Sequence, residues 1–278
     1  MLNLVPLRWI MWNITTDPGK QYNGGLKTNW RDEWAAAQKH YAPMISNDSA
    51  QGFMLGAPIN YRIHDIVKHL LSTACPSQRQ LIVSTCGFEP AGDELVWQEC
   101  TVEAVALLAE AVRADFPTAP IYYNENVPVV LHGRNRGGHA VNFSVPPALT
   151  WFSFDYYHFN GKDEGVHVNT VRTVYKEHVY TKLLPHQQVL LVPGAFAVPA
   201  GAAIPGGFKC NESCFDAMGA DDAAHYWTWA HEDTRVVGLA VWEWDDGGGR
   251  LGAMTMAQTR AAWKAIGRKV LNAAHTLD

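Results

Sequence analysis

The sequence predicts an α/β fold, a (β/α)8 barrel, from three observations. Short apolar segments typical of strands alternate with helical patterns about 10–15 residues long, which indicates parallel strands joined by helices. The strand segments are apolar at nearly every position, as expected when both faces of a sheet are covered. The chain also lacks G-x-G-x-x-G after its first strand and any G-x-x-x-x-G-K-[ST], which disfavours the doubly wound nucleotide-binding folds.

The length fits one large α/β domain or two small ones, and because no linker divides the chain we expect one. The chain has 278 residues, 47% of them hydrophobic, which supplies the core of a single domain over 1–278. The formal net charge is −5 and Lys and Arg do not cluster, so we expect no nucleic-acid partner. No run of about 18 apolar residues occurs, so we expect no membrane-spanning helix.

Apolar patterns predict six or seven strands, fewer than the eight of a complete barrel. The strand segments are 8–12, 52–55, 81–85, 121–123, 151–156, 189–192 and 236–242. The predicted barrel is therefore incomplete at its N-terminus or irregular.

Helical spacing of apolar residues predicts the connections between these strands. Thr101 can cap a helix whose inner face includes Val105 and Leu108, and Ser213 with Asp216 resembles a second capping pair. The predicted helices cover 29–41, 63–70, 101–116, 171–179, 213–227 and 263–270.

Acidic residues interleaved with aromatic ones lie at or just after the ends of four of the predicted strands. They are Asp93 and Glu94; Tyr123, Asn124 and Glu125; Asp155 and Tyr156; and Trp242, Glu243 and Trp244. Catalytic residues of a barrel gather at these carboxyl ends of the strands. Carboxylates suit the hydroxyl groups and acid–base chemistry of sugars, and aromatic faces suit their C–H surfaces, so this pattern predicts a carbohydrate ligand.

These motifs resemble the (β/α)8-barrel glycoside hydrolase superfamily over roughly residues 50–265, without the full signature of any one family. Gly92-Asp93-Glu94 resembles the acidic motif that follows the fourth strand of those enzymes. The segment 122–125 is similar to their Asn-Glu strand end, and Trp242-Glu243-Trp244 to the tryptophan-bearing eighth strand that floors their sugar pocket. The resemblance implies hydrolysis of O-glycosidic bonds in a carbohydrate or glycoconjugate.

The resemblance also implies roles for the acids. Glu94 would protonate the leaving oxygen, kept protonated by the neighbouring Asp93 and by a tryptophan-lined pocket. Glu125 or Glu243 would act as the second catalytic carboxylate. If Asp93 instead orients an acetamido group of the substrate, no protein nucleophile is required. The predicted substrate-binding residues are Asp93, Tyr123, Asn124, Asp155, Tyr156, Trp242 and Trp244.

The chain departs from this pattern between its second strand and its first acids. The strand at 52–55, followed by Gly56, reads as one that should continue directly into Asp93 and Glu94, so we interpret 57–92 as an insertion. In that interpretation 81–85 is not a barrel strand. The segment 9–12 then becomes the third strand, and the first two are absent.

Cysteines and sequons predict a secreted or lumenal glycoprotein. Cys210 and Cys214 are close enough for a small disulfide ring, and the number of cysteines, five, is odd. Sequons begin at Asn13, Asn47, Asn142 and Asn211. No signal peptide is visible, so either the chain is cytoplasmic or its true N-terminus is missing.

No cofactor is implied, and a monomer is favoured. The 12 histidines show neither HExxH nor another paired metal-binding spacing, so we expect no metal site. No G-x-S-x-G is present, which disfavours an α/β-hydrolase. Two other interpretations remain open: a carbohydrate-binding barrel without catalytic activity, and a truncated, inactive barrel.

Overall fold

The computed structural model describes residues 9–13, 31–32, 34–35, 38–39, 42–43, 52–56, 94–158, 167–198, 210–244 and 250–275. Asp93, the strand predicted at 81–85 and the whole proposed insertion 57–92 lie outside these residues.

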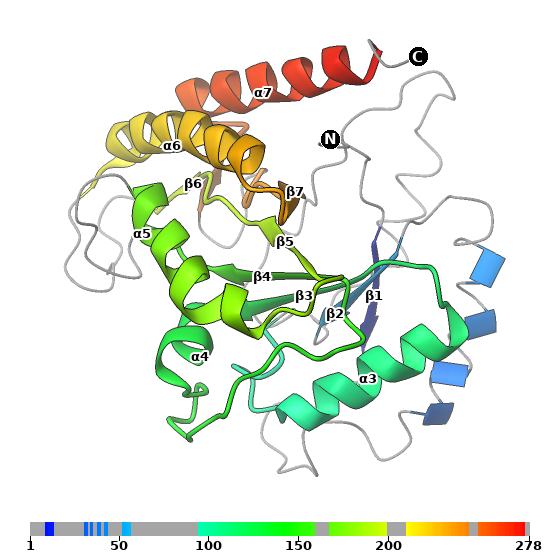
Figure 1. Ribbon diagram of the computed structural model, residues 1–278. Coiled ribbons are helices and arrows are strands. Elements are labelled where there is room, and N and C mark those ends of the chain that lie inside the picture. Colours follow the sequence, from blue (N-terminus) through cyan, green and yellow to red (C-terminus); the bar gives the residue numbers. More distant parts are fainter. Residues whose placement is uncertain are drawn as a thin grey trace.

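Six parallel strands form one sheet (Figure 1). The strands are β1 (Trp9–Asn13), β2 (Gly52–Gly56), β3 (Ile121–Asn126), β4 (Trp151–Asp155), β5 (Gln188–Leu191) and β7 (Val236–Leu239). Each of the six pairs in parallel with the next in the sequence, in the order β1-β2-β3-β4-β5-β7. The predicted α/β fold with a parallel sheet is therefore confirmed.

The strand order distinguishes between the parallel folds. In a doubly wound sheet the order reverses, and ligands bind at the point of reversal. Among the described residues the order runs along the sequence without reversal, from β1 to β7. The prediction against a doubly wound fold is confirmed, and successive strands bring their carboxyl ends to one edge.

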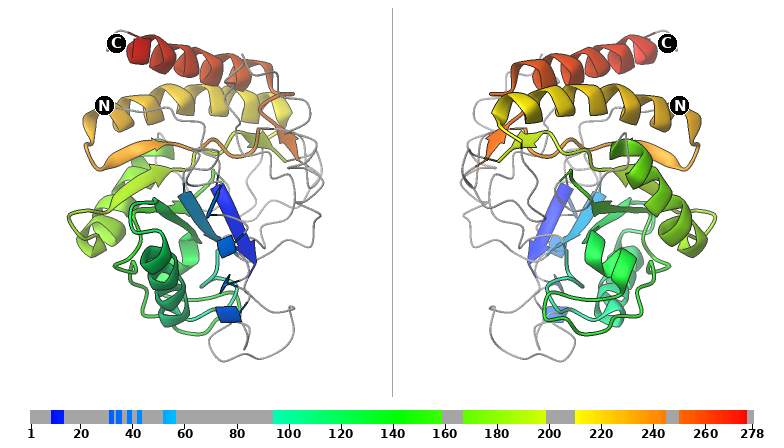
Figure 2. Two further views of the ribbon diagram at one scale, coloured as in Figure 1. Left: turned by 90° about the vertical axis from the view of Figure 1, so that its right-hand side faces the viewer. Right: turned by 90° about the vertical axis from the view of Figure 1, so that its left-hand side faces the viewer.

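Helices cover the outside of the sheet (Figures 1 and 2). They are α3 (Val102–Asp115), α4 (Val127–His132), α5 (His167–Val174), α6 (Glu212–Glu232) and α7 (Ala257–His275). A π-helical turn, Tyr175–Val179, and a 3-10 turn, Tyr180–Lys182, extend α5, while β6 (Phe196–Ala197) and β8 (Leu251–Gly252) form a small antiparallel pair. None of the helices in the described ranges is long and apolar enough to cross a membrane.

The strands β3 and β4 separate apolar from polar side chains by simple alternation. Ile121 and Tyr123 of β3 and Phe152 and Phe154 of β4 belong to the core that the helices complete. The intervening residues of both strands therefore face the other side of the sheet. This alternation decides which polar side chains can reach a ligand.

The N-terminus of α3 is capped as predicted. The Thr101 hydroxyl accepts a hydrogen bond from the backbone N–H of Ala104 at 3.1 Å. The side chains of Val105, Leu108 and Val112 are buried along the same helix.

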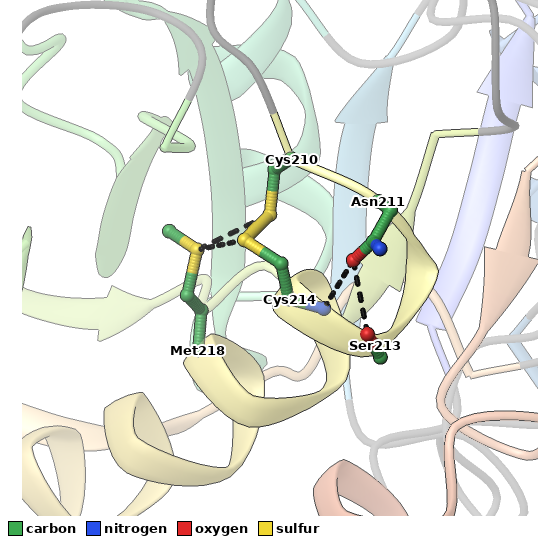
Figure 3. The surroundings of a disulfide bond; sticks show 5 residues. All are labelled: Cys210, Asn211, Ser213, Cys214 and Met218. Carbon is green, nitrogen blue, oxygen red and sulfur yellow. Dashed lines mark hydrogen bonds between the residues drawn. A yellow bond between two sulfur atoms is a disulfide. The ribbon is translucent and has the colours of Figure 1, made fainter.

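The predicted cap of α6 is wrong, whereas the small disulfide ring that the spacing of Cys210 and Cys214 allows is present. Asn211, not Ser213, is the N-cap, and its Oδ1 accepts the Cys214 N–H at 3.0 Å (Figure 3). The Cys210–Cys214 bridge closes this first turn, and Met218 Sδ lies 3.6 Å from each of its sulfurs. Because Asn211 already supplies the cap, Ser213 lies inside the helix, and its hydroxyl bonds to Asn211 instead.

Asp216 acts on the neighbouring helix instead of its own. Its carboxylate accepts the backbone N–H groups of Thr259 at 2.8 Å and Gln258 at 3.1 Å, in the first turn of α7. Burial acts to raise the pKa of Asp216, but the hydrogen bonds from Thr259 and Gln258 hold it below its ordinary value. Asp216 therefore fixes the start of α7 against α6, which lie side by side in Figures 1 and 2.

We expect Asp216→Ala to lower the free energy of unfolding by about 0.5–2 kcal/mol, because two N–H groups of α7 lose their acceptor. Urea unfolding followed by circular dichroism measures this loss. Asp221→Ala, an exposed substitution of the same kind on α6, is the matched control and should cost less. Equal losses in both variants would show that the contact to α7 contributes nothing.

Candidate functional site

A directed chain of hydrogen bonds crosses the polar face of β3 and β4. The Tyr122 hydroxyl lies 2.6 Å from Ser153 Oγ, and Ser153 Oγ in turn donates to Asn124 Oδ1. Asn124 Nδ2 donates to Asp155 Oδ1 at 3.0 Å. With both hydroxyl protons directed along this chain, it ends at the Asp155 carboxylate, at the carboxyl end of β4.

Glu94 contacts this polar face through Asn126, the last residue of β3. Its Oε1 accepts a hydrogen bond from Asn126 Nδ2 at 2.6 Å, and the side chain is 1% exposed. Asn126 is paired with Asp155 in the sheet register. Glu94 and Asp155 are thus held by two alternate residues of one strand, Asn126 and Asn124.

Glu125 belongs to the opposite face of β3. Its carboxylate accepts the N–H groups of Val96 at 3.1 Å, Trp97 at 3.2 Å and Asn126 at 2.7 Å, and the Tyr123 hydroxyl. The side chain is completely buried. Glu125 therefore attaches the turn that follows Glu94 to the strand.

Burial dominates the electrostatics of Glu125. It raises the pKa of that carboxyl to about 7, although the hydrogen bonds from Tyr123, Asn126, Trp97 and Val96 act in the opposite direction. The Tyr123 hydroxyl, also buried, has a pKa raised by burial and by the charge of Glu125.

Glu243 reaches the same edge of the sheet beyond β7. The chain there forms a parallel bridge between Gly194 and Trp242, and the Trp242 N–H donates to the Pro193 carbonyl at 2.9 Å. Glu243 is 2% exposed, with Arg250 Nη1 3.8 Å from its Oε2, and the Trp242–Glu243 peptide bond is cis.

The aromatic residues expected to bind substrate differ in their surroundings. Tyr123 and Tyr156 are part of the buried core, and Tyr156 stacks on His167 with ring centroids 5.7 Å apart. Trp242 and Trp244 keep partial exposure, and Trp244 packs against the edge of the core. The two tryptophans are therefore better placed to meet a ligand than the two tyrosines.

Two polar residues of this face, Asn126 and Ser153, were not anticipated from the sequence. Asn126 lies two residues after Asn124 on β3, and Ser153 lies two residues before Asp155 on β4. Period-two alternation along β3 and β4 is the signal that could have identified them.

An open groove of about 630 Å³ lies beside the turn that follows Glu94. It is formed by the connections after β2 and β3, and its lining residues are Trp97, Pro128, His132, Arg134, Asn135, Arg136 and Gly138.

Three side chains that can ligate a metal converge near the end of β4. One nitrogen or oxygen from each of His158, His167 and Asp222 lies within 4.8 Å of the others. His158 Nε2 is 2.8 Å from Asp222 Oδ2, and His167 Nε2 is 3.1 Å from the Tyr156 carbonyl oxygen. The rings of the two histidines have centroids 3.9 Å apart and are inclined by 30°.

Comparison with known proteins identifies no family. No family model and no curated protein matches the chain. Among solved structures, two of a GH113 β-1,4-mannanase, one of them a complex, are similar at 17% and 16% sequence identity, with TM-scores of 0.42 and 0.41. The matches cover 88% and 87% of this chain and 67% and 66% of the mannanase chains. Similarity at this level establishes neither family nor activity.

We expect the contribution of Glu125 to the free energy of unfolding to decrease as the pH rises. Since its pKa is raised from 4.5 to about 7, the folded state keeps a proton between these values that the unfolded state has lost. That contribution is full below pH 4.5 and is lost as the pH rises to 7.

Glu125→Gln tests this, because glutamine does not titrate. At pH 7 it should destabilise by about 1–3 kcal/mol, since its amide N–H₂ faces backbone donors. In denaturant unfolding, the difference between wild type and variant should be largest near pH 4.5 and shrink toward pH 7. A constant difference across that range would contradict the raised pKa.

Proposed function

We propose that this protein is a glycoside hydrolase of the (β/α)8-barrel type, acting on O-glycosidic bonds of a carbohydrate or glycoconjugate. One observation carries the proposal: Glu94 and Asp155 are held on one face of β3, at the carboxyl edge of a parallel sheet with sequential strand order. That edge is where barrel enzymes place their catalytic groups. The sequential order also supports closure of the sheet into a barrel.

Glu94 is proposed as the general acid. Asn126 donates to its Oε1, so in the acid form the proton is expected on Oε2, from which it can pass to the leaving oxygen. Glu94 is 1% exposed, so little bulk water competes for this carboxyl. Asp93 is proposed to orient an acetamido group of the substrate, as the resemblance implies.

Glu243 is proposed as the second carboxylate. Arg250 Nη1 lies 3.8 Å from its Oε2, and a carboxylate at this place can stabilise an oxocarbenium-like transition state or activate water. Trp242 and Trp244 on either side offer faces to the sugar ring. Asp155 and Asn124 supply hydrogen bonds to hydroxyl groups.

Glu125, a candidate from the sequence, is proposed here as a positioning residue. Within the described residues, its carboxylate accepts hydrogen bonds from the backbone of 96–97, the Asn126 N–H and the Tyr123 hydroxyl, on the helix-covered face of the sheet. It therefore acts on the site through the turn that carries Glu94.

Secretion is also proposed. The Cys210–Cys214 disulfide supports an oxidising compartment, because such bridges are rare in reducing cytosol.

A screen of aryl glycosides tests the proposed roles. With a poor leaving group, Glu94→Gln should reduce kcat/KM by about 10²–10⁴-fold, because the departing oxygen is no longer protonated. With a dinitrophenyl leaving group, which departs without a proton, the loss should be much smaller. Glu243→Gln should lose activity on both substrates.

Glu110→Gln, an exposed substitution on α3, is the control and should match wild type. Equal rates for wild type and Glu94→Gln on both substrates would remove the assignment of the acid. Sugar binding by a wild-type protein that hydrolyses nothing would favour the carbohydrate-binding barrel, and absence of cooperative unfolding would favour the truncated one.

A further inference from the structure

We propose that His158, His167 and Asp222 form a binding site for a divalent transition metal, with Zn²⁺ as the best-matched ion. Two imidazoles and a carboxylate are the donor set that borderline ions such as Zn²⁺ and Co²⁺ prefer over Mg²⁺ or Ca²⁺. The three side chains come from the segment after β4, from the first turn of α5 and from the middle of α6. No sequence spacing could reveal this site, because the fold alone brings them together.

Burial is the first argument for a metal. His167 is 3% exposed and the Asp222 side chain 3% exposed. A buried carboxylate requires a compensating positive charge. Within the described part of the chain, Asp222 pairs with His158, a group that is cationic only when protonated. A divalent ion supplies that charge whatever the state of the histidine.

The orientation of His167 is the second argument. Its Nε2 lies 3.1 Å from the Tyr156 carbonyl oxygen, an acceptor, so Nε2 carries the hydrogen in the neutral ring. Nδ1 then bears the lone pair that a metal requires. A ligating histidine typically donates its other N–H to a backbone carbonyl in this way, and stacking on Tyr156 further fixes the ring.

His158 has to move for the ion to enter. Two imidazoles bound to one tetrahedral ion have centroids roughly 5 Å apart, given Zn–N distances of about 2.0–2.1 Å. The two rings now lie 3.9 Å apart, and the His158–Asp222 hydrogen bond is 2.8 Å long. His158 is the most exposed of the three, with 13% of its side chain accessible, and it is the ring that the proposal requires to turn. The metal then replaces the proton shared with Asp222.

Such an ion would fix the end of β4 to α5 and α6. Asp155, at the end of β4, lies three residues before His158, so the metal would stabilise the edge of the sheet that carries the polar face. The site does not depend on the proposed glycosidase activity, and its test does not use that activity.

Isothermal titration of the full chain with ZnCl₂, after removal of metals by a chelator, tests the proposal. Wild type should bind one Zn²⁺ per chain and unfold at a higher temperature with it, while MgCl₂ should produce neither effect. Asp222→Asn and His167→Gln should each weaken Zn²⁺ binding by about tenfold or more. Bound Co²⁺ should show the visible d–d bands of a four-coordinate ion.

The matched control is Asp221→Asn, which changes the neighbouring, exposed carboxylate of α6, paired with His225 at 3.6 Å. It should bind Zn²⁺ as wild type does. If Asp222→Asn does not unfold cooperatively, His158→Gln, at the more exposed position, replaces it in the comparison. Absence of Zn²⁺ binding by wild type, or equal affinity in the cluster variants and the control, would show that the three residues form a hydrogen-bonded cluster only.

Discussion

The arrangement of the site depends on the hydrogen bonds that the buried carboxylate of Glu125 accepts from the backbone. It receives the backbone N–H groups of Val96 and Trp97, and through them it fixes the turn that begins at Glu94. A turn whose N–H groups were buried without an acceptor would be costly, so the turn has one favoured position against β3. From that position the Glu94 side chain reaches Asn126 on the other face of the strand. One acid on the helix side of the sheet thus places another on the polar side.

Alternation along β3 gives neighbouring residues opposite roles. Tyr123 and Glu125 face the helices, while Tyr122, Asn124 and Asn126 face the opposite side. The residues of the Asn-Glu pair therefore contribute differently: Asn124 is part of the hydrogen-bonded chain to Asp155, and Glu125 is part of the support behind it. A short motif read as one unit in the sequence is divided between two faces by the geometry of the strand.

Polar contacts between elements also fix the outer layer of helices. Asp216 of α6 accepts N–H groups at the start of α7, and Trp34 donates to Asp115 of α3 at 2.6 Å. Gly219 allows α6 to approach α7 closely, because a Cβ there would lie 2.6 Å from Thr259 Oγ1. These contacts join residues far apart in the chain, and so hold these elements against one another independently of local helix propensity.

The sequence by itself determined the parallel α/β class, six of the strands and the Thr101 cap, and it showed that Cys210 and Cys214 are close enough to form a bridge. These depend on hydrophobic periodicity and on groups a few residues apart, which are visible along the chain. Only the tertiary structure decided that Glu94 meets Asn126, that Glu125 faces the helices, that Asp216 serves α7 instead of α6, and that His158 lies against Asp222. Each of these contacts joins different elements, and its geometry follows from strand register and helix packing, which local pattern does not encode.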